Sequence, residues 1–202
     1  SHPMAGRERG GAIAARADLF LGRPWVLAPA PTAAADGLWA VENIAADAGA
    51  IPIIMPAAEH DAAVALVSHV PQVIASALAA RLRGAVPEAV SLAGGGLRDT
   101  TRIAESDPAL WVQILGANAT PVAAILREIR SDLDAAITAL DDPDAPGARR
   151  AIADLLAAGN AGVASIPGKH GRTERFTSIT LLIDDRPGEL ARLLTEIGVL
   201  GV

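Results

Sequence analysis

The segment Glu59–Arg83 reads EHDAAVALVSHVPQVIASALAARLR and is the longest apolar run of the chain. Read at a helical period, its apolar residues lie on nearly every face, which predicts a helix at the centre of a helical domain or of a subunit interface. Ser68, His69 and Gln72 interrupt the run, and polar groups inside a bilayer are costly, so we do not expect a membrane span. The chain should therefore be organised around one buried helix.

Pro71 should distort this helix. Proline offers no N–H to the carbonyl of Val67, and its ring crowds that carbonyl, so we expect a kink beside His69. His60 stands nine positions before His69, and at about 100° per residue the two should point to opposite sides of one helix. We therefore expect His69 at a small polar site and His60 in a structural role outside it. The alternative for His69 is a core histidine with no chemical role.

The composition limits the classes of protein that fit. The chain has 202 residues, of which 51% are hydrophobic and 2% aromatic, and its alanine content favours close-packed helices over a β-sandwich. A net charge of -6 argues against nucleic acid or an anionic membrane as a partner. The absence of cysteine excludes disulfides and a cysteine nucleophile. With no signal peptide in the printed sequence, we expect a cytoplasmic protein.

Two short apolar runs bounded by prolines, Pro24–Pro29 and Ile51–Met55, predict buried strands. Between them, Asp36–Ala48 predicts a helix with Asp36 as its N-cap and Gly49 as its stop. Strand, helix and strand form a βαβ unit, but two strands do not make a stable sheet alone. We expect their remaining partners to lie outside the printed sequence.

From residue 57 onward the pattern is helical, and it ends in a separate strand, turn and helix. After the Glu59–Arg83 helix the expected elements are Pro108–Leu115, Thr120–Leu140 with Thr120 as cap and Pro121 at its first position, Ala148–Ala158, a glycine-rich linker, and a terminal strand and helix entered at Asp185 and Pro187. The acidic stretch 141–147, DDPDAPG, predicts a boundary.

His2 is the first candidate for chemistry and lies near Glu8 and Arg9 in a glycine-rich turn, GRERGG. A residue before proline is held in an extended backbone, so the His2 side chain should project from a strand end. The alternative is an ordinary surface histidine.

Three glycines open the segment Gly94–Arg102. They permit close backbone approach, yet the run lacks the Gly-Lys-Ser/Thr ending of a phosphate loop. Arg98 and Arg102 stand four positions apart, so on a helix they should face the same way and bind a carboxylate. For Arg98 the alternative is an ion pair with a neighbouring acidic residue such as Asp99.

The sequence gives no support for a metal site or a dinucleotide fingerprint. Glu59, His60 and Asp61 are adjacent rather than spaced as HExxH, and no GxGxxG follows a predicted strand. From the residues alone we expect an acidic, mainly helical protein with a carboxylate-binding cleft and no metal.

Four motifs also occur in one order along residues 1–140. They are His2-Pro3-Met4-Ala5-Gly6 with Glu8, Asp18-Leu19-Phe20 with Gly22, Ser68-His69-Val70-Pro71, and Gly94 to Ala104 running on to Asp107-Pro108 and Trp111. Together they resemble the prephenate dehydrogenases, the NAD-dependent enzymes of tyrosine biosynthesis. The tail DRPGEL, residues 185–190, resembles the start of an ACT domain, a small module that senses amino acids.

The resemblance implies a mainly α fold in four parts. They are 1–56, the last strands of a Rossmann-type nucleotide-binding domain; 57–145, a helical dimerisation and substrate domain; 146–172, a helix and linker; and 173–202, a partial ACT module of βα form. It also implies a homodimer through the helical domain, which explains a helix that is apolar all round. Because the glycine fingerprint is absent, we expect this polypeptide alone to bind no NAD and to be inactive.

The family's reaction is the oxidative decarboxylation of prephenate to 4-hydroxyphenylpyruvate with NAD. His2 matches the catalytic histidine, which hydrogen-bonds the ring hydroxyl and favours its deprotonation as hydride departs. Arg102 matches the arginine that holds a substrate carboxylate. The remaining matches are His69 as a second substrate-side residue, Trp111 as a pocket wall, and Glu8, Arg98 and Asp99 as an ionic gate at the cleft mouth.

Two alternatives stay open. An arogenate dehydrogenase acts on a substrate with an amine in place of the side-chain keto group, and the sequence does not separate these substrates, or NAD from NADP. A non-catalytic, dimerising and regulatory scaffold is the second alternative. An amino-acid effector at the ACT module, with tyrosine as an inhibitor, is a further expectation that the sequence leaves undecided.

Overall fold

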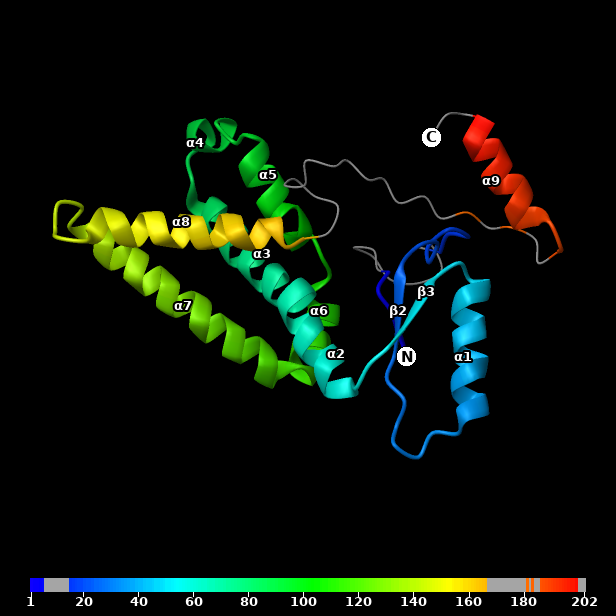
Figure 1. Cartoon of the computed structure of the whole chain (residues 1–202). Coiled ribbons are helices and arrows are strands. Elements are labelled where there is room, and N and C mark those ends of the chain that lie inside the picture. The colour runs from blue at the N-terminus through cyan, green and yellow to red at the C-terminus, as the bar shows by residue number, and fades with distance from the viewer. Residues whose placement is uncertain (6–14, 167–180, 182, 184–185, 200–202) are drawn as a thin grey trace.

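A small β-sheet with one helix stands beside an assembly of helices in the computed structural model (Figure 1). The structure describes residues 1–5, 15–166, 181, 183 and 186–199. Within these residues the chain is mainly helical, as predicted. Glu8, Arg9, Asp185 and most of the predicted terminal strand lie outside the described residues.

The sheet confirms the predicted βαβ unit. Its strands are β1 (His2–Pro3), β2 (Pro24–Leu27) and β3 (Ile51–Ile54), in the order β1-β2-β3. β2 and β3 are parallel, with Val26 opposite Ile53, and α1 (Ala35–Asp47) connects them. β1 pairs antiparallel with β2, which sets His2 opposite Val26. His2 therefore lies on a strand, as predicted.

The ends of α1 differ in how well the sequence predicted them. Gly49 follows the helix with φ +76°, and a Cβ there would lie 2.8 Å from Cδ1 of Leu21, so glycine is required at this turn. The N-cap prediction is wrong, because the helix begins at Ala35 and Asp36 already lies in its first turn. The Asp36 carboxylate instead accepts the N–H of Gly37 at 2.9 Å.

The two apolar strands are not equally buried. Val26 and Leu27 of β2 are 6% and 3% exposed, whereas Ile51 and Ile54 of β3 are each 50% exposed. The prediction of a buried β3 is therefore wrong for the part of the chain that the structure describes. Here β3 is an edge strand, and an apolar run indicates suitability for burial without supplying the surface that covers it.

The central helix is distorted where Pro71 predicts a distortion. It consists of α2 (Ala57–Val64), the π-helical segment η2 (Ala65–His69) and α3 (Val70–Ala80). The N–H of Val70 bonds the carbonyl of Ala65, five residues back. The missing proline N–H is thus accommodated by a wider turn.

The remaining helices run from the end of α3 to the terminal segment. They are η3 (Arg81–Gly84), α4 (Pro87–Ser91), α5 (Gly95–Thr101), η4 (Arg102–Ala104), α6 (Pro108–Ala117), α7 (Ala119–Asp141), α8 (Ala148–Ala164) and α9 (Glu189–Val199). The prediction of Thr120 as a cap is wrong, because α7 begins one residue earlier, after Asn118. Helix α8 also continues six residues beyond the predicted Ala158.

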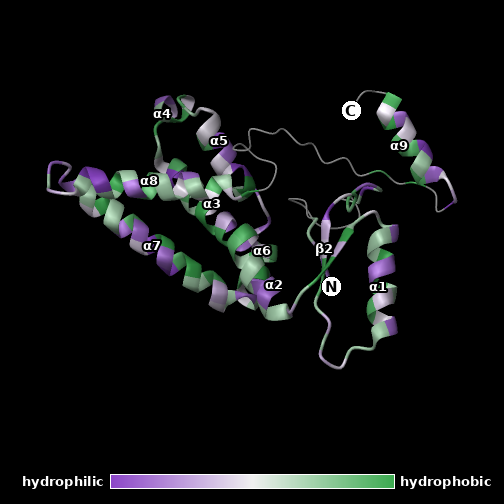
Figure 2. Cartoon of the chain, in the orientation of Figure 1, coloured by the Kyte–Doolittle hydropathy of each residue, from purple (hydrophilic) through white to green (hydrophobic). Residues whose placement is uncertain are grey.

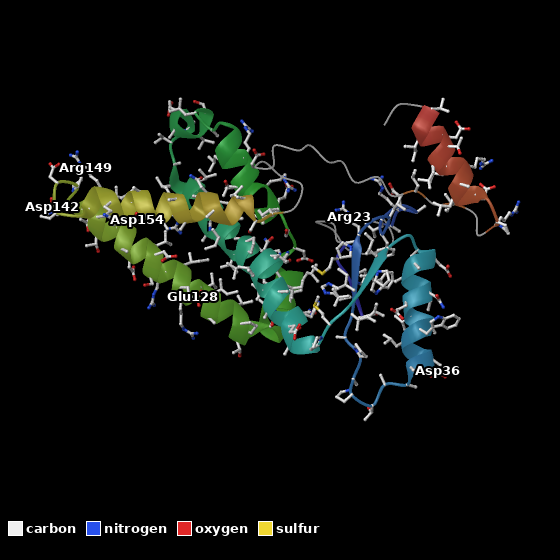
Figure 3. All side chains as sticks on the ribbon, viewed as in Figure 1. Arg23, Asp36, Glu128, Asp142, Arg149 and Asp154 are labelled. Carbon is white, nitrogen blue, oxygen red and sulfur yellow. The ribbon has the colours of Figure 1, made fainter. Side chains whose placement is uncertain are left out.

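Helices α7 and α8 form an antiparallel hairpin (Figure 1). Its turn is the acidic stretch 141–147 predicted to break the helix, and Gly147 has φ +92° there. Figure 3 shows Asp142 and Arg149 together at this turn, where Nη2 of Arg149 donates to Oδ1 of Asp144 at 2.7 Å.

The core of the helical part confirms the central place of the long helix. Ala65, Val70 and Val122 are buried together. The partly buried side chains around them are Ile74, Leu115, Ile125, Leu126 and Ile129. Residues of η2 and α3 therefore pack against α6 and α7 in a core of aliphatic side chains.

The same helix also has an exposed apolar side. Leu66 is 59% exposed and Val67 64%, so all-round burial is not reached within one chain. By length and composition alone the run Ala57–Gly84 could cross a membrane, but His69 and Gln72 are buried among protein groups. Figure 2 shows apolar and polar residues alternating along α7, which carries further exposed apolar side chains such as Ile137.

Candidate active site

A cavity of about 460 Å³ lies where the first strand meets the helices. Its described lining comes from three segments: His2, Pro3, Met4 and Ala5; then Ser68, His69 and Gln72; then Arg102, Ile103, Ser106, Leu110, Trp111 and Ile114. The structure thus brings together His2, His69, Arg102 and Trp111, the four residues that the resemblance assigns to catalysis or substrate binding. These residues span 109 positions of sequence, so the fold and not local sequence assembles the site.

His2 is held by the sheet on one side and by a second histidine on the other. The N–H of Met4 bonds the carbonyl of Pro24 at 2.7 Å, which fixes the strand that carries His2. Nδ1 of His2 lies 2.9 Å from Nε2 of His60, and the two rings meet edge to face. Burial, and then the positive charges that His60 and His69 can carry, lower the pKa of His2 below its usual 6.5.

His60 stays outside the described lining of the cavity, as predicted, but the prediction that it lies on the opposite side of the helix from the site is wrong, because it contacts His2. The π-helical segment η2 lies between His60 and His69 and absorbs about one extra residue per turn. The two side chains are therefore rotated apart by roughly 100° less than in a regular α-helix. His60 does not line the cavity within the described residues, but it contacts His2 and helps lower the pKa of both His2 and His69.

A carboxylate orients His60. Nδ1 of His60 lies 3.0 Å from Oδ1 of Asp61. Since a carboxylate only accepts, Nδ1 of His60 is the donor and its Nε2 is left as an acceptor in the neutral ring. Nδ1 of His2 must then donate to His60, which leaves Nε2 of His2 with a free lone pair.

His69 is buried, with 7% of its surface exposed. Nδ2 of Asn118 lies 3.1 Å from its Nδ1, and the Trp111 ring meets it edge to face at 6.1 Å between centroids. Burial and the charge of His60 lower the pKa of His69, although Asp61 acts in the opposite direction. His69 is thus neutral near pH 7. It is both buried and part of the cavity lining, and its role in substrate binding stays a prediction.

The two arginines separate, contrary to the prediction. Arg102 lines the cavity, whereas Arg98 does not. Arg98 lies within α5, whereas Arg102 begins the 3₁₀ turn η4, so the two arginines belong to different elements. Asp99 also lies on α5 and does not line the cavity within the described residues. The ionic gate stays a prediction, since Glu8 is not among the described residues.

The sequence did not predict the places of Asn118 and Gln72 in the site. Both are buried, at 8% and 6% exposure. Nε2 of Gln72 donates to Oγ of Ser76 at 3.4 Å, and Gln72 lines the cavity. Asn118 precedes α7 without capping it through its side chain. Its only sequence signal is an asparagine at the α6–α7 junction, which reads as an ordinary helix boundary.

The described lining of the cavity carries a positive charge. It includes the guanidinium of Arg102 and two imidazoles, and no aspartate or glutamate. In the described ranges no group of three potential metal ligands could hold a metal ion. An arginine beside neutral histidines and apolar walls suits an organic anion with a hydroxyl or keto group.

A protein-family model matches most of the helical part of the chain. Residues 56–154 match the family described as "Prephenate dehydrogenase, dimerization domain". This range contains the central helix, the buried core and nine of the lining residues. The helical part of the chain therefore matches the dimerisation domain of the prephenate dehydrogenases.

Similarity to individual relatives extends beyond residues 56–154. A protein of Streptomyces niveus, "Probable prephenate dehydrogenase NovF", is 37% identical over 211 residues, covering 100% of this chain and 58% of the relative. A cyclohexadienyl dehydrogenase of Zymomonas mobilis is 33% identical over 148 residues, covering 71% of this chain and 50% of the relative. The chain thus spans about half the length of these relatives.

Two solved structures are also similar. A prephenate dehydrogenase from Aquifex aeolicus, in complex with hydroxyphenyl propionate and NAD+, matches with a TM-score of 0.66 and 28% identity over 80% of this chain and 55% of its own. A Synechocystis arogenate dehydrogenase matches with a TM-score of 0.62 and 28% identity over 80% of this chain and 60% of its own.

Proposed function

We propose that this chain forms the substrate side of an NAD-dependent prephenate dehydrogenase, which converts prephenate to 4-hydroxyphenylpyruvate in tyrosine biosynthesis. The observation that carries the proposal is one cavity lined by His2, His69 and Arg102 without a carboxylate in its described lining. Prephenate carries two carboxylates and a ring hydroxyl, so it matches the cavity in charge and chemistry. A volume of about 460 Å³ is in the usual range for a small-molecule site.

His2 acts as the acceptor of the hydroxyl proton. Its Nδ1 donates to His60, so the lone pair on Nε2 is available to the substrate. The lowered pKa keeps the ring neutral at physiological pH, which a general base requires. As the ring carbon loses hydride, Nε2 takes the proton and a carbonyl forms. That carbonyl draws the electron pair of the carboxylate-bearing bond as carbon dioxide leaves, and His2 returns the proton to the phenolate oxygen.

Arg102 and His69 hold the substrate. The Arg102 guanidinium pairs with a substrate carboxylate, and a charge-assisted bond inside a cavity is stronger than one in water. His69 adds a neutral hydrogen-bonding group, and Trp111 packs against its ring and forms part of the apolar wall. These contacts fix the orientation of the ring hydroxyl relative to His2.

When bound, NAD supplies the hydride acceptor of this reaction. The described residues do not form a site for it. The β2–α1 connection, residues 28–34, reads APAPTAA and has no glycine to bring backbone amides close to a pyrophosphate. We therefore assign no described residue to NAD.

We further infer that the helical part forms a homodimer and that the protein is cytoplasmic. The matched domain is named for dimerisation. The exposed apolar side chains of the central helix and α7, among them Leu66, Val67 and Ile137, supply a surface for a second copy. The terminal helix α9 follows Gly188, which has φ +96°. It lies in the tail that resembles the start of an ACT module, so we infer that it belongs to an amino-acid-sensing part.

Arogenate dehydrogenase is the second candidate function. One similar structure carries that name, and the same cavity could hold a substrate with an amine in place of the keto group. Both candidate functions use His2, His69 and Arg102. The choice between prephenate and arogenate therefore depends on the protein group that contacts the substrate side chain.

The test is NADH formation by the full-length protein with prephenate or arogenate as substrate, beside gel filtration to determine the oligomeric state. We expect turnover of prephenate by a dimer. A folded dimer that forms NADH with neither substrate would support the scaffold alternative and overturn the proposed activity.

A further inference from the structure

Asn118 makes two contacts that a helix boundary does not need. Its side chain leaves the N-terminus of α7 uncapped. It is buried, and its Nδ2 donates to the carbonyl of Asp61 at 2.8 Å and lies 3.1 Å from Nδ1 of His69. These partners precede it by 57 and 49 positions. One amide group therefore ties the start of α7 to both α2 and η2.

The Asp61 carbonyl decides which way the amide points. A carbonyl oxygen has no proton to donate, so the group facing it must be the amide nitrogen and not Oδ1. The second proton of that nitrogen then points to Nδ1 of His69. Nδ1 must accept it with its lone pair, which places the imidazole proton on Nε2.

His69 carries no proton on Nδ1 that it could donate to a ligand. Burial and the charge of His60 lower its pKa, so the ring is neutral near pH 7. Nε2 has no hydrogen-bond partner within the described residues. It is not fully buried either. Among the described residues, the polar side-chain atom that is both fully buried and without a hydrogen-bond partner is Nε1 of Trp25. Nε2 of His69 therefore keeps some exposed surface. His69 lines the cavity, and its Nδ1 faces Asn118, so we take Nε2–H as the group that a ligand meets.

We propose that Asn118 is a positioning residue that fixes His69 as a hydrogen-bond donor into the cavity, so that the site selects an acceptor oxygen over an ammonium group. The proposal rests on the proposed function for its substrates. A keto or carboxylate oxygen accepts from Nε2–H, whereas an ammonium group only donates and leaves both groups unpaired. We expect the kcat/KM for prephenate to exceed that for arogenate by about 10- to 100-fold, the effect of one unpaired buried polar group.

The tautomer can be read directly, without activity. In the ¹⁵N-histidine-labelled chain, long-range ¹H–¹⁵N correlation spectra distinguish protonated from unprotonated ring nitrogens, and loss of one set of signals in His69→Gln assigns the ring. We expect Nε2–H for His69 at pH 7.5. In Asn118→Asp, which is nearly isosteric, a carboxylate faces Nδ1, so we expect the proton to move to Nδ1. A structural role alone would not move it.

A wild-type His69 protonated on Nδ1, or on both nitrogens, would overturn the proposal, even if Asn118→Asp failed to fold. An unchanged tautomer in a folded Asn118→Asp would do the same.

Selectivity is measured separately as the ratio of kcat/KM for prephenate and arogenate in the full-length protein. We expect Asn118→Asp to reduce the preference for prephenate. If neither substrate reacts, the proposed function fails while the spectra still test the tautomer. If arogenate reacts as well as prephenate although His69 carries Nε2–H, the inference about selectivity fails and the proposed function stands.

Discussion

Nδ1 of His2 lies 2.9 Å from Nε2 of His60, although 58 positions separate the two residues in sequence. The contact joins the first strand to the start of the central helix. It also continues through Nδ1 of His60 to the carboxylate of Asp61 at 3.0 Å. This chain of donors and acceptors leaves Nε2 of His2 as the acceptor on which the proposed chemistry depends.

Replacing His60 should shift the pH profile of the enzyme. His60 is among the causes that lower the pKa of His2, and His2 must be neutral to take a proton. In His60→Gln, the Oε1 atom can still accept from Nδ1 of His2, but the side chain can no longer become charged. We therefore expect the acid limb of kcat/KM to move to higher pH, toward 6.5. A limb that stays in place or moves to lower pH would show that His60 does not act on His2.

Folding stability should decrease as the pH falls through 6.5. The pKa values of His2 and His69 are both lowered on folding from an ordinary 6.5. Below that value the unfolded chain binds more protons than the folded chain, so protons favour unfolding. We expect the free energy of unfolding, from urea denaturation, to decrease from pH 7.5 to 5.5.

His69→Gln removes one of these two groups, so the decrease should be smaller than in the wild-type chain. Arg149→Gln, at the exposed α7–α8 turn, is the control and should keep the wild-type pH dependence. An equal decrease in His69→Gln and wild type would contradict the lowered pKa of His69.

Arg102→Gln should weaken substrate binding. Arg102 lines the cavity but is an exposed residue, so loss of its charge-assisted bond should cost about 1.5 to 3 kcal/mol, and KM for prephenate should increase by roughly 10- to 150-fold. Arg149→Gln is the matched control, because Arg149 is 84% exposed at a distant turn and pairs with Asp144. An unchanged KM in Arg102→Gln would remove Arg102 from the binding site.

The central helix should be part of the dimer interface. Val67 is 64% exposed in the middle of that helix, so Val67→Lys would place a charge in an apolar interface and should produce monomers in gel filtration. Trp39→Lys is the control, since Trp39 is a comparably exposed apolar residue of α1, at 67% and outside the matched domain. A dimer that survives Val67→Lys and dissociates in Trp39→Lys would place the interface elsewhere.

The periodicity of the chain predicted most elements of the fold because local signals determine them. Prolines and glycines bound β2, β3 and α1, and the apolar run from residue 59 predicted the central helix. Burial was harder to predict. The exposure of Ile51 and Ile54 depends on what covers the sheet edge, and this is a tertiary property that an apolar pattern does not contain.

Motifs far apart in the sequence grouped His2, His69, Arg102 and Trp111, and these residues line one cavity. Their roles in catalysis and binding stay predictions. The position of His60 was not predicted because it depends on the π-helical segment, a change of helical pitch that residue counting at a fixed 100° does not include.

The most direct measurement of the central claim is the turnover of His2→Asn in the full-length protein, with prephenate and NAD. Asparagine keeps a polar group at the strand end but cannot accept the hydroxyl proton. The account predicts that kcat falls by about 10²- to 10⁴-fold, the usual contribution of a general base, while KM stays close to that of the wild-type protein. Near-normal turnover by a folded His2→Asn would contradict it.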